Sequence, residues 1–184
     1  MQKGGFFMNY QELNFMLKEL GRIPYPELKC VEPDYSFGRL VYDAYAGGKS
    51  ELTTILSYIF EYLTNGEEEE VVTFLKMIAK QEMKHLELLG EILVSLGLEP
   101  YYMSTYGNKW CSDNVKVKFN SLEEMLAFNI QMEKEAIEAY QHLVNVCGNE
   151  SIKAIISRII MDEESHVQIF EMLKSKYAEC ECEK

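Results

Sequence analysis

Apolar residues recur every three or four positions along four long segments of the chain, the spacing that places them on one face of an α-helix. The segments cover residues 36–64, 67–96, 121–147 and 149–178. At 1.5 Å per residue, each segment would form a helix roughly 40 Å long. The pattern therefore predicts an all-α protein whose four helices each bury one apolar stripe.

The connections between these segments predict how the helices are arranged. Asn65-Gly66 and Gly148-Asn149 are very short joints, so the helices on either side of each joint are expected to be antiparallel neighbours. Residues 97–120 are rich in Gly, Asn and Tyr, lack a lasting periodicity, and are numerous enough to run back along a bundle. The sequence thus predicts an antiparallel four-helix bundle with a long crossover between helices 2 and 3.

Capping residues mark the start of two of these helices. Ser121 and Glu124 have the spacing of a capping box, and Asn149 is a favoured N-cap directly before the fourth segment. Four consecutive glutamates, residues 67–70, open the second segment, where negative charge suits the positive end of the helix dipole.

The residues outside the four helices form two smaller regions. Residues 1–35 are expected to be an N-terminal arm in which a short helix stops at Gly21 and a proline-punctuated stretch follows. We expect this arm to lie on the bundle or on a second subunit. The bundle is assigned to residues 36–178, and residues 179–184 are assigned to a C-terminal tail.

Each inward stripe carries one glutamate near its middle, and two of these glutamates are followed three residues later by a histidine. These residues are Glu51, Glu82, His85, Glu133, Glu163 and His166. The first two glutamates are 31 residues apart and the last two are 30 residues apart, so the pattern repeats in the two halves of the chain. Because both hairpins are tight, all six residues are expected at a similar depth in the bundle.

Four glutamates buried side by side need compensating positive charge. Each unpaired buried ion would cost at least several kcal/mol, and the stripes contain no Lys or Arg. Two divalent cations would balance the four carboxylates, with both histidines acting as neutral ligands. Glutamates on two helices and Glu-x-x-His pairs on the two others are typical of di-iron and di-manganese bundles. The sequence therefore predicts a dinuclear metal site.

Some polar and aromatic residues on or near the stripes also have a purely structural interpretation. A single Glu-x-x-His pair could be a hydrogen-bonded pair in the core, but the second copy favours a metal site. His142 has no glutamate three residues before it and is expected on the surface. Tyr58, Tyr62 and Tyr140 are expected to fill the core, although one of them can hydrogen-bond a ligand glutamate.

Composition limits the classes of partner. The net charge of −12 argues against binding to nucleic acid, and no apolar run approaches the roughly 18 residues of a membrane span. Five cysteines, an odd number without a C-x-x-C pair, argue against a disulfide framework and against a four-cysteine metal site. We expect a soluble cytoplasmic protein that binds neither nucleic acid nor membrane.

The residues around the predicted site resemble the ferritin-like superfamily. GGKSELTTILSYI (47–59), KQEMKHLELLGEIL (80–93), MEKEAIEAYQHL (132–143) and MDEESHVQIF (161–170) are most similar to the manganese catalase group, which includes manganese-catalase-like spore coat proteins. Rubrerythrin-like proteins are the next most similar, but they usually carry a rubredoxin domain, and the sequence contains no four-cysteine segment of that kind. The resemblance covers residues 36–178 and implies a ferritin-like bundle.

The resemblance also implies a role for each candidate residue. Matched position by position, the terminal ligands are Glu51 and Glu133, the bridging carboxylate is Glu82, and the imidazole ligands are His85 and His166. The residue that matches Glu163 bridges the metals in the rubrerythrin and ferritin groups, whereas in manganese catalases it lies beside the site and moves protons. Glu163 is therefore expected either as a metal ligand or as the catalytic proton carrier.

These observations lead to an expected activity and to three alternatives. Two Mn or two Fe ions per chain are expected to act on hydrogen peroxide or dioxygen, with catalase-type disproportionation of peroxide favoured. The alternatives are a rubrerythrin-like di-iron peroxidase with an external electron donor, a ferritin-like protein that oxidises and stores iron, and a structural coat protein. A homo-oligomer, dimeric or larger, is expected in the cytoplasm, with the spore coat as an alternative location.

Overall fold

The computed structural model describes residue 15 and residues 22–181. These residues form the helices α2 (Tyr35–Ala46), α3 (Glu51–Thr64), α4 (Glu69–Ser95), α5 (Leu122–Val146) and α6 (Glu150–Glu181), with a short 3-10 turn η1 (Ser112–Asn114). The described residues contain no β-strand, so the predicted all-α class is confirmed. The short helix expected before Gly21 lies outside the described residues.

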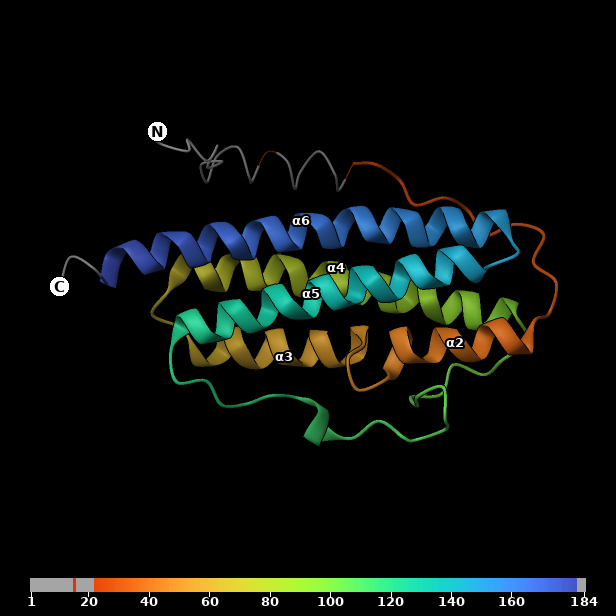
Figure 1. The fold of residues 1–184 in the computed structure, drawn as a ribbon, viewed down its shortest axis with the longest axis horizontal. Coiled ribbons are helices and arrows are strands. Elements are labelled where there is room, and N and C mark those ends of the chain that lie inside the picture. The colour runs from red at the N-terminus through yellow and green to blue at the C-terminus, as the bar shows by residue number, and fades with distance from the viewer. Residues whose placement is uncertain (1–14, 16–21, 182–184) are drawn as a thin grey trace.

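The helices form an elongated antiparallel bundle (Figure 1). Helices α3 and α4 pack against each other, as do α5 and α6, and α2 contacts α3, α4 and α5. In Figure 1, α2 and α3 lie end to end along one side and α6 lies along the opposite side. The crossover between α4 and α5 runs past α2 and α3, as the hydrogen bonds from Thr105 N to Asp43 and from Trp110 Nε1 to Thr53 show. The predicted bundle with a long crossover is confirmed.

The first helix is not continuous over residues 36–64 as expected, because α2 ends at Ala46 and α3 begins at Glu51. Two successive glycines, Gly47 and Gly48, weaken the helix at this point. Ser50 then caps α3, since its Oγ accepts a hydrogen bond from the backbone N–H of Thr53 at 3.3 Å. The break places Glu51 in the first turn of α3, at the positive end of its dipole.

The capping residues that the sequence indicated act largely as expected. Ser121 Oγ accepts a hydrogen bond from the backbone N–H of Glu124 at 3.1 Å. The Glu124 carboxylate accepts in turn from the backbone N–H of Asn120 and not from that of Ser121. Asn149 Oδ1 accepts from the N–H groups of Ser151 at 2.9 Å and Ile152 at 3.1 Å, which confirms it as the N-cap of α6. Helix α6 continues past the expected end at residue 178 to Glu181.

The described end of the N-terminal arm, residues 22–34, lies against α6 of its own chain. Lys29 exchanges backbone hydrogen bonds with Ser151 Oγ, and Arg158 donates to the carbonyl oxygen of Ile23. The Tyr25 hydroxyl donates to Asp162 at 2.7 Å. The arm therefore reaches the middle of the bundle through Tyr25.

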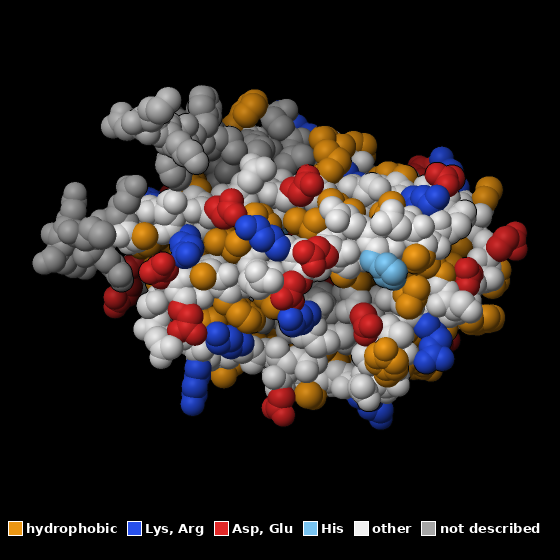
Figure 2. Space-filling view, viewed as in Figure 1, with side chains coloured by type: hydrophobic (Ala, Val, Ile, Leu, Met, Phe, Trp, Pro, Cys, Tyr) orange, Lys and Arg blue, Asp and Glu red, His pale blue; other side chains and the backbone are white. Residues whose placement is uncertain are grey.

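Two apolar clusters fill the bundle, one at each end. Their fully buried members include Leu89, Ile92, Leu93, Ile152 and Ile156 in one cluster, and Phe74, Leu75, Leu126, Phe170 and Leu173 in the other. On the outside, Figure 2 shows acidic and basic side chains interspersed over the face that it presents. No helix in the described part of the chain combines the length and the apolar character needed to cross a bilayer.

Candidate metal centre

The six residues singled out from the sequence meet in the middle of the bundle, and none is more than 4% exposed. Their ligand atoms fall into two groups, and within each group all atoms lie within 4.8 Å of one another. One group consists of Glu51, Glu82, His85 and Glu163. The other consists of Glu82, Glu133, Glu163 and His166. Glu82 and Glu163 belong to both groups. The arrangement can therefore hold two metal ions that share these two carboxylates.

Four helices contribute to the centre in a repeated way. Helices α3 and α5 each supply one glutamate, and α4 and α6 each supply a Glu-x-x-His pair. A spacing of three residues places the glutamate and the histidine of each pair on the same helix face, so both point into the bundle. The repeat seen in the sequence thus becomes an approximate two-fold symmetry of the site.

The distances around the histidines show how close this symmetry is. His85 Nδ1 lies 2.9 Å from Glu82 Oε2, 3.0 Å from Glu163 Oε1 and 3.8 Å from Glu51 Oε2. His166 Nδ1 repeats these distances with its own partners: 2.9 Å to Glu163 Oε2 and 3.0 Å to Glu82 Oε1. Glu163 therefore occupies the same position relative to the two histidines as Glu82 does.

The remaining glutamate on each side is held by a buried tyrosine. Tyr140 donates a hydrogen bond to Glu51 Oε1, and Tyr58 donates one to Glu133 Oε1. Both tyrosines are 1% exposed. The sequence indicated that one of them could bond a ligand glutamate, and the structure shows that both do. The signal was present as a repeat, because each tyrosine follows the glutamate of its own helix by seven residues.

The outer nitrogen of each histidine has a partner that the sequence analysis missed. His85 Nε2 lies 3.2 Å from Asp162 Oδ2, and His166 Nε2 lies 3.2 Å from Gln81 Oε1. Asp162 directly precedes Glu163 and Gln81 directly precedes Glu82, so each partner comes from the opposite Glu-x-x-His motif. The only available signal was this shared position before the glutamate.

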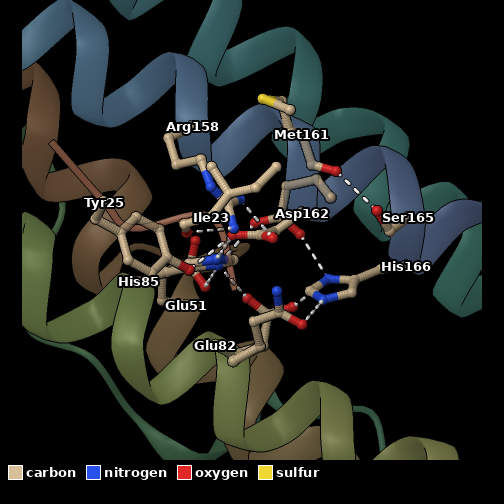
Figure 3. Close-up of polar contacts among 12 residues, drawn as sticks. Ile23, Tyr25, Glu51, Glu82, His85, Arg158, Met161, Asp162, Ser165 and His166 are labelled. Carbon is tan, nitrogen blue, oxygen red and sulfur yellow. Dashed lines mark hydrogen bonds and ion pairs between the residues drawn. The ribbon is translucent and has the colours of Figure 1, made fainter. Parts of the chain in front are cut away.

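Asp162 belongs to a larger buried network, which Figure 3 shows around His85. Its Oδ1 lies 2.6 Å from Arg158 Nη1, and its Oδ2 accepts a hydrogen bond from the Tyr25 hydroxyl. The Arg158 guanidinium also lies 4.8 Å from the centre of the Tyr25 ring. The arm and α6 together therefore fix the carboxylate that faces His85.

Burial and mutual repulsion control the protonation of the centre. Burial, together with the charges of Glu82 and Glu163, raises the pKa of Glu51 and of Glu133 well above the ordinary range. Burial also opposes ionisation of Glu82 and Glu163, but both histidines outweigh it and lower the pKa of these two carboxyls.

The pKa values of the two histidines are affected by burial and by charge in the opposite sense to those of the carboxyls. Burial lowers the pKa of His85 and His166, but the surrounding carboxylates outweigh it and raise both well above the ordinary range. These shifts favour protons on Glu51, Glu133 and both imidazoles. Four protons supply the positive charge that two divalent ions would supply.

Further features of the centre agree with bound metal ions. Glu82 Oε1 and Glu163 Oε1 are buried, and each lies 3.0 Å from a histidine Nδ1 without hydrogen-bond geometry to any described residue. A donor set of four carboxylates and two imidazoles is hard and rich in oxygen, which suits Mn and Fe better than Cu or Zn. The residues present thus fit a dinuclear centre of Mn or Fe.

A small pocket of about 20 Å³ reaches the centre beside the break between α2 and α3. Its lining includes all four glutamates of the centre together with Lys49, Ser50, Met132 and Tyr140. A space of this size holds about one water-sized molecule. The pocket therefore has room for a very small molecule beside the centre.

The fold and the site define a four-helix bundle of the dinuclear carboxylate class. The family model of the ferritin-like domain matches residues 51–177, more than two thirds of the chain. The chain therefore belongs to the ferritin-like family. A search of curated proteins gives no match to this sequence.

Solved structures with the same fold include a catalase and bacterioferritins. The manganese catalase KatB from Anabaena is 21% identical, with a TM-score of 0.77 over 85% of this chain and 79% of that chain. The bacterioferritin of Desulfovibrio desulfuricans, described with a diiron site, is 24% identical, with a TM-score of 0.63 over 76% and 78% of the two chains. The bacterioferritin of Rhodobacter capsulatus is 22% identical, with a TM-score of 0.66 over 80% and 89%. At these identities the likeness shows the shared fold.

Proposed function

We propose that this protein is a dinuclear metal oxidoreductase that disproportionates hydrogen peroxide. The observation that carries the proposal is the pocket of about 20 Å³ whose lining includes all four glutamates of the centre. A pocket of this size admits a molecule such as peroxide and excludes an organic substrate from the reacting site. The fold shared with a manganese catalase supports the same activity.

Each residue of the centre has a proposed role. The shared ligands are Glu82 and Glu163, one metal position is completed by Glu51 and His85, and the other by Glu133 and His166. The equal distances from both histidines to Glu82 and Glu163 support shared ligation by both carboxylates. Tyr140 and Tyr58 would orient the two terminal carboxylates.

The chemistry of disproportionation balances without an external reductant. One peroxide loses two electrons and two protons to become O2, and a second takes them up to become two waters. When bound, the two metal ions would each change oxidation state by one electron, and the pair would thus store the two electrons between the two half-reactions. The protein must also hold the two protons, and we propose that the Glu163 carboxylate, which lines the pocket, carries one of them. Proton transfer by a positioned side chain contributes typically 10²- to 10⁴-fold to a rate.

Metal analysis of native protein and an oxygen-release assay with peroxide test this function together. We expect near two Mn per chain and steady release of O2. The Glu82→Ala variant should lose dinuclear binding. Glu163→Gln keeps an amide oxygen as a ligand atom, so it should lower metal content less than Glu82→Ala does, but O2 release per bound metal pair should fall about 10²-fold. Glu61→Gln, a buried substitution outside the centre, should match the wild type in metal content and O2 release. Protein with two metals but no O2 release would refute the catalase activity.

A ferroxidase is the second candidate, favoured by the fold shared with a bacterioferritin described with a diiron site. The same centre would then hold two Fe ions and use dioxygen as the oxidant. Fe(II) oxidation in air without O2 release from peroxide would support this candidate over the catalase. Consumption of peroxide that depends on an added electron donor would instead support a peroxidase.

A further inference from the structure

The two halves of the centre match on the side that faces the metals but differ on the outer side. The distances from each Nδ1 to the carboxylates are the same in the two halves. On the outer side, His85 Nε2 faces a carboxylate, that of Asp162, whereas His166 Nε2 faces the amide oxygen of Gln81. Both outer distances are 3.2 Å, so the difference between the halves is chemical rather than geometric.

The outer partner affects how strongly an imidazole binds a metal. When Nδ1 is a ligand, Nε2 carries a proton and donates to its partner. A carboxylate partner makes the ring a stronger ligand, and losing such a partner typically costs 10- to 100-fold in metal affinity. A neutral amide accepts a weaker hydrogen bond than a carboxylate does. His85 should therefore bind its metal more strongly than His166.

The two partners also differ in how firmly they are held. Asp162 is completely buried, and Arg158 and the Tyr25 hydroxyl fix both of its oxygens. Gln81 is only partly buried and lines an open pocket of about 320 Å³ on the face of α4. The carboxylate that faces His85 is therefore held by two neighbours besides the ring, whereas the side chain that faces His166 is partly exposed to solvent. This second difference acts in the same direction as the first.

We propose that the two metal positions are unequal, and that the position formed with Glu51 and His85 binds its ion more tightly than the position formed with Glu133 and His166. Asp162 and Gln81 are positioning residues in this proposal, because each acts through a histidine. The inference rests on the dinuclear centre of the proposed function, although not on which reaction the centre catalyses.

Site-resolved metal occupancy tests the proposal without an activity assay. Apo protein is given one equivalent of Mn(II) per chain, crystallised, and measured by anomalous diffraction at the Mn edge. We expect occupancy at the His85 position to exceed that at the His166 position by about tenfold or more. Because occupancy is measured at each position, repulsion between the two ions does not imitate the result.

Two substitutions of equal size vary the outer partners. Gln81→Glu gives His166 a carboxylate partner and should bring the two occupancies close together, while Gln141→Glu adds the same charge at an exposed position of α5 and should leave them unequal. Asp162→Asn should lower occupancy at the His85 position, but it leaves Arg158 without its carboxylate and can impair folding. Gln81→Glu, at a partly exposed position, avoids that risk.

The possible outcomes distinguish a failure of the unequal metal positions from a failure of the dinuclear centre. Equal occupancy in the wild type, or an unchanged ratio in Gln81→Glu, would overturn the unequal positions while leaving a dinuclear centre in place. Failure of the wild type to bind Mn or Fe at either position would overturn the centre and the proposal together.

Discussion

Glu61 is a buried carboxyl outside the metal centre, and its protonation should make the free energy of unfolding depend on pH. It lies on α3, is completely buried, and accepts a hydrogen bond at 2.6 Å from Asn129 Nδ2 of α5. Burial raises its pKa to about 8, although the bond from Asn129 acts in the opposite sense. Glu61 Oε1 and Asn129 Oδ1 are both buried acceptors without a donor among the described residues. A proton on Glu61 Oε1 would supply such a donor, so we expect a neutral carboxyl at pH 7.

The sign and size of the effect follow from the pKa. The folded pKa of about 8 lies above the ordinary value of 4.5, so the folded state binds more protons than the unfolded state between these two pH values. Stability contributed by the neutral carboxyl is therefore lost as the pH rises through that window. At about 1.4 kcal/mol per pH unit, the loss is about 3 kcal/mol at pH 7 and about 5 kcal/mol above pH 8.

The Glu61→Gln substitution removes this pH dependence. Glutamine has the same shape and stays neutral, and its amide can donate to Asn129 Oδ1 while its oxygen accepts from Asn129 Nδ2. We expect the variant to match the wild type near pH 4.5, to be more stable by about 3 kcal/mol at pH 7, and by about 5 kcal/mol above pH 8.

Urea unfolding at pH 5, 7 and 8.5 measures this difference directly. Both proteins are kept free of metal with a chelator, so that the titration of the metal centre is common to both and cancels. Glu138→Gln, an exposed substitution on α5, is the matched control and should show no trend with pH. If the difference between Glu61→Gln and the wild type stays constant from pH 5 to pH 8.5, the reasoning about Glu61 is wrong.

Further predictions concern the metal centre. Because the pKa shifts favour protons on two carboxyls and two imidazoles, adding two divalent ions at pH 7 should release up to four protons per chain, measured by pH-stat. Metal affinity should then fall as the pH is lowered, and loading without proton release would contradict this reasoning. Chelation should lower the melting temperature, since each ion at 100 times its Kd stabilises the fold by about 2.7 kcal/mol; an unchanged melting temperature would mean that the ions do not bind the folded centre. Tyr58→Phe and Tyr140→Phe should each weaken metal binding by about 1 kcal/mol, seen by calorimetry, because each leaves a terminal glutamate without its hydrogen bond, and a large effect from only one of them would argue against the two-fold symmetry.

The sequence predicted the bundle and the meeting of six residues because both depend on periodicity along single helices. The 3-4 spacing of apolar residues places one stripe inward, and a glutamate within that stripe must then be buried. Two tight hairpins set the depth of these glutamates. Each step uses only local information, so it can be read from one helix at a time.

The features that the sequence did not predict depend on contacts between helices. The break before Glu51 is stabilised by the crossover, since Trp110 Nε1 donates to Thr53 Oγ1 at 2.9 Å. Asp162 contacts a histidine of α4 from α6, and Tyr25 joins it from the arm. None of these contacts has a periodic signature, because each joins residues that the fold alone brings together.

The charge of the centre explains how four carboxylates can lie in a core before any metal binds. Without cations, the pKa shifts favour ionised Glu82 and Glu163, protonated histidines and neutral Glu51 and Glu133, a combination whose net charge is zero. With two divalent ions, four ionised carboxylates and two neutral imidazoles also sum to zero. Loading therefore exchanges protons for metal at constant charge, and neither state leaves an uncompensated ion between the two apolar clusters. The positive charge that four buried glutamates require is thus supplied by protons in one state and by metal ions in the other.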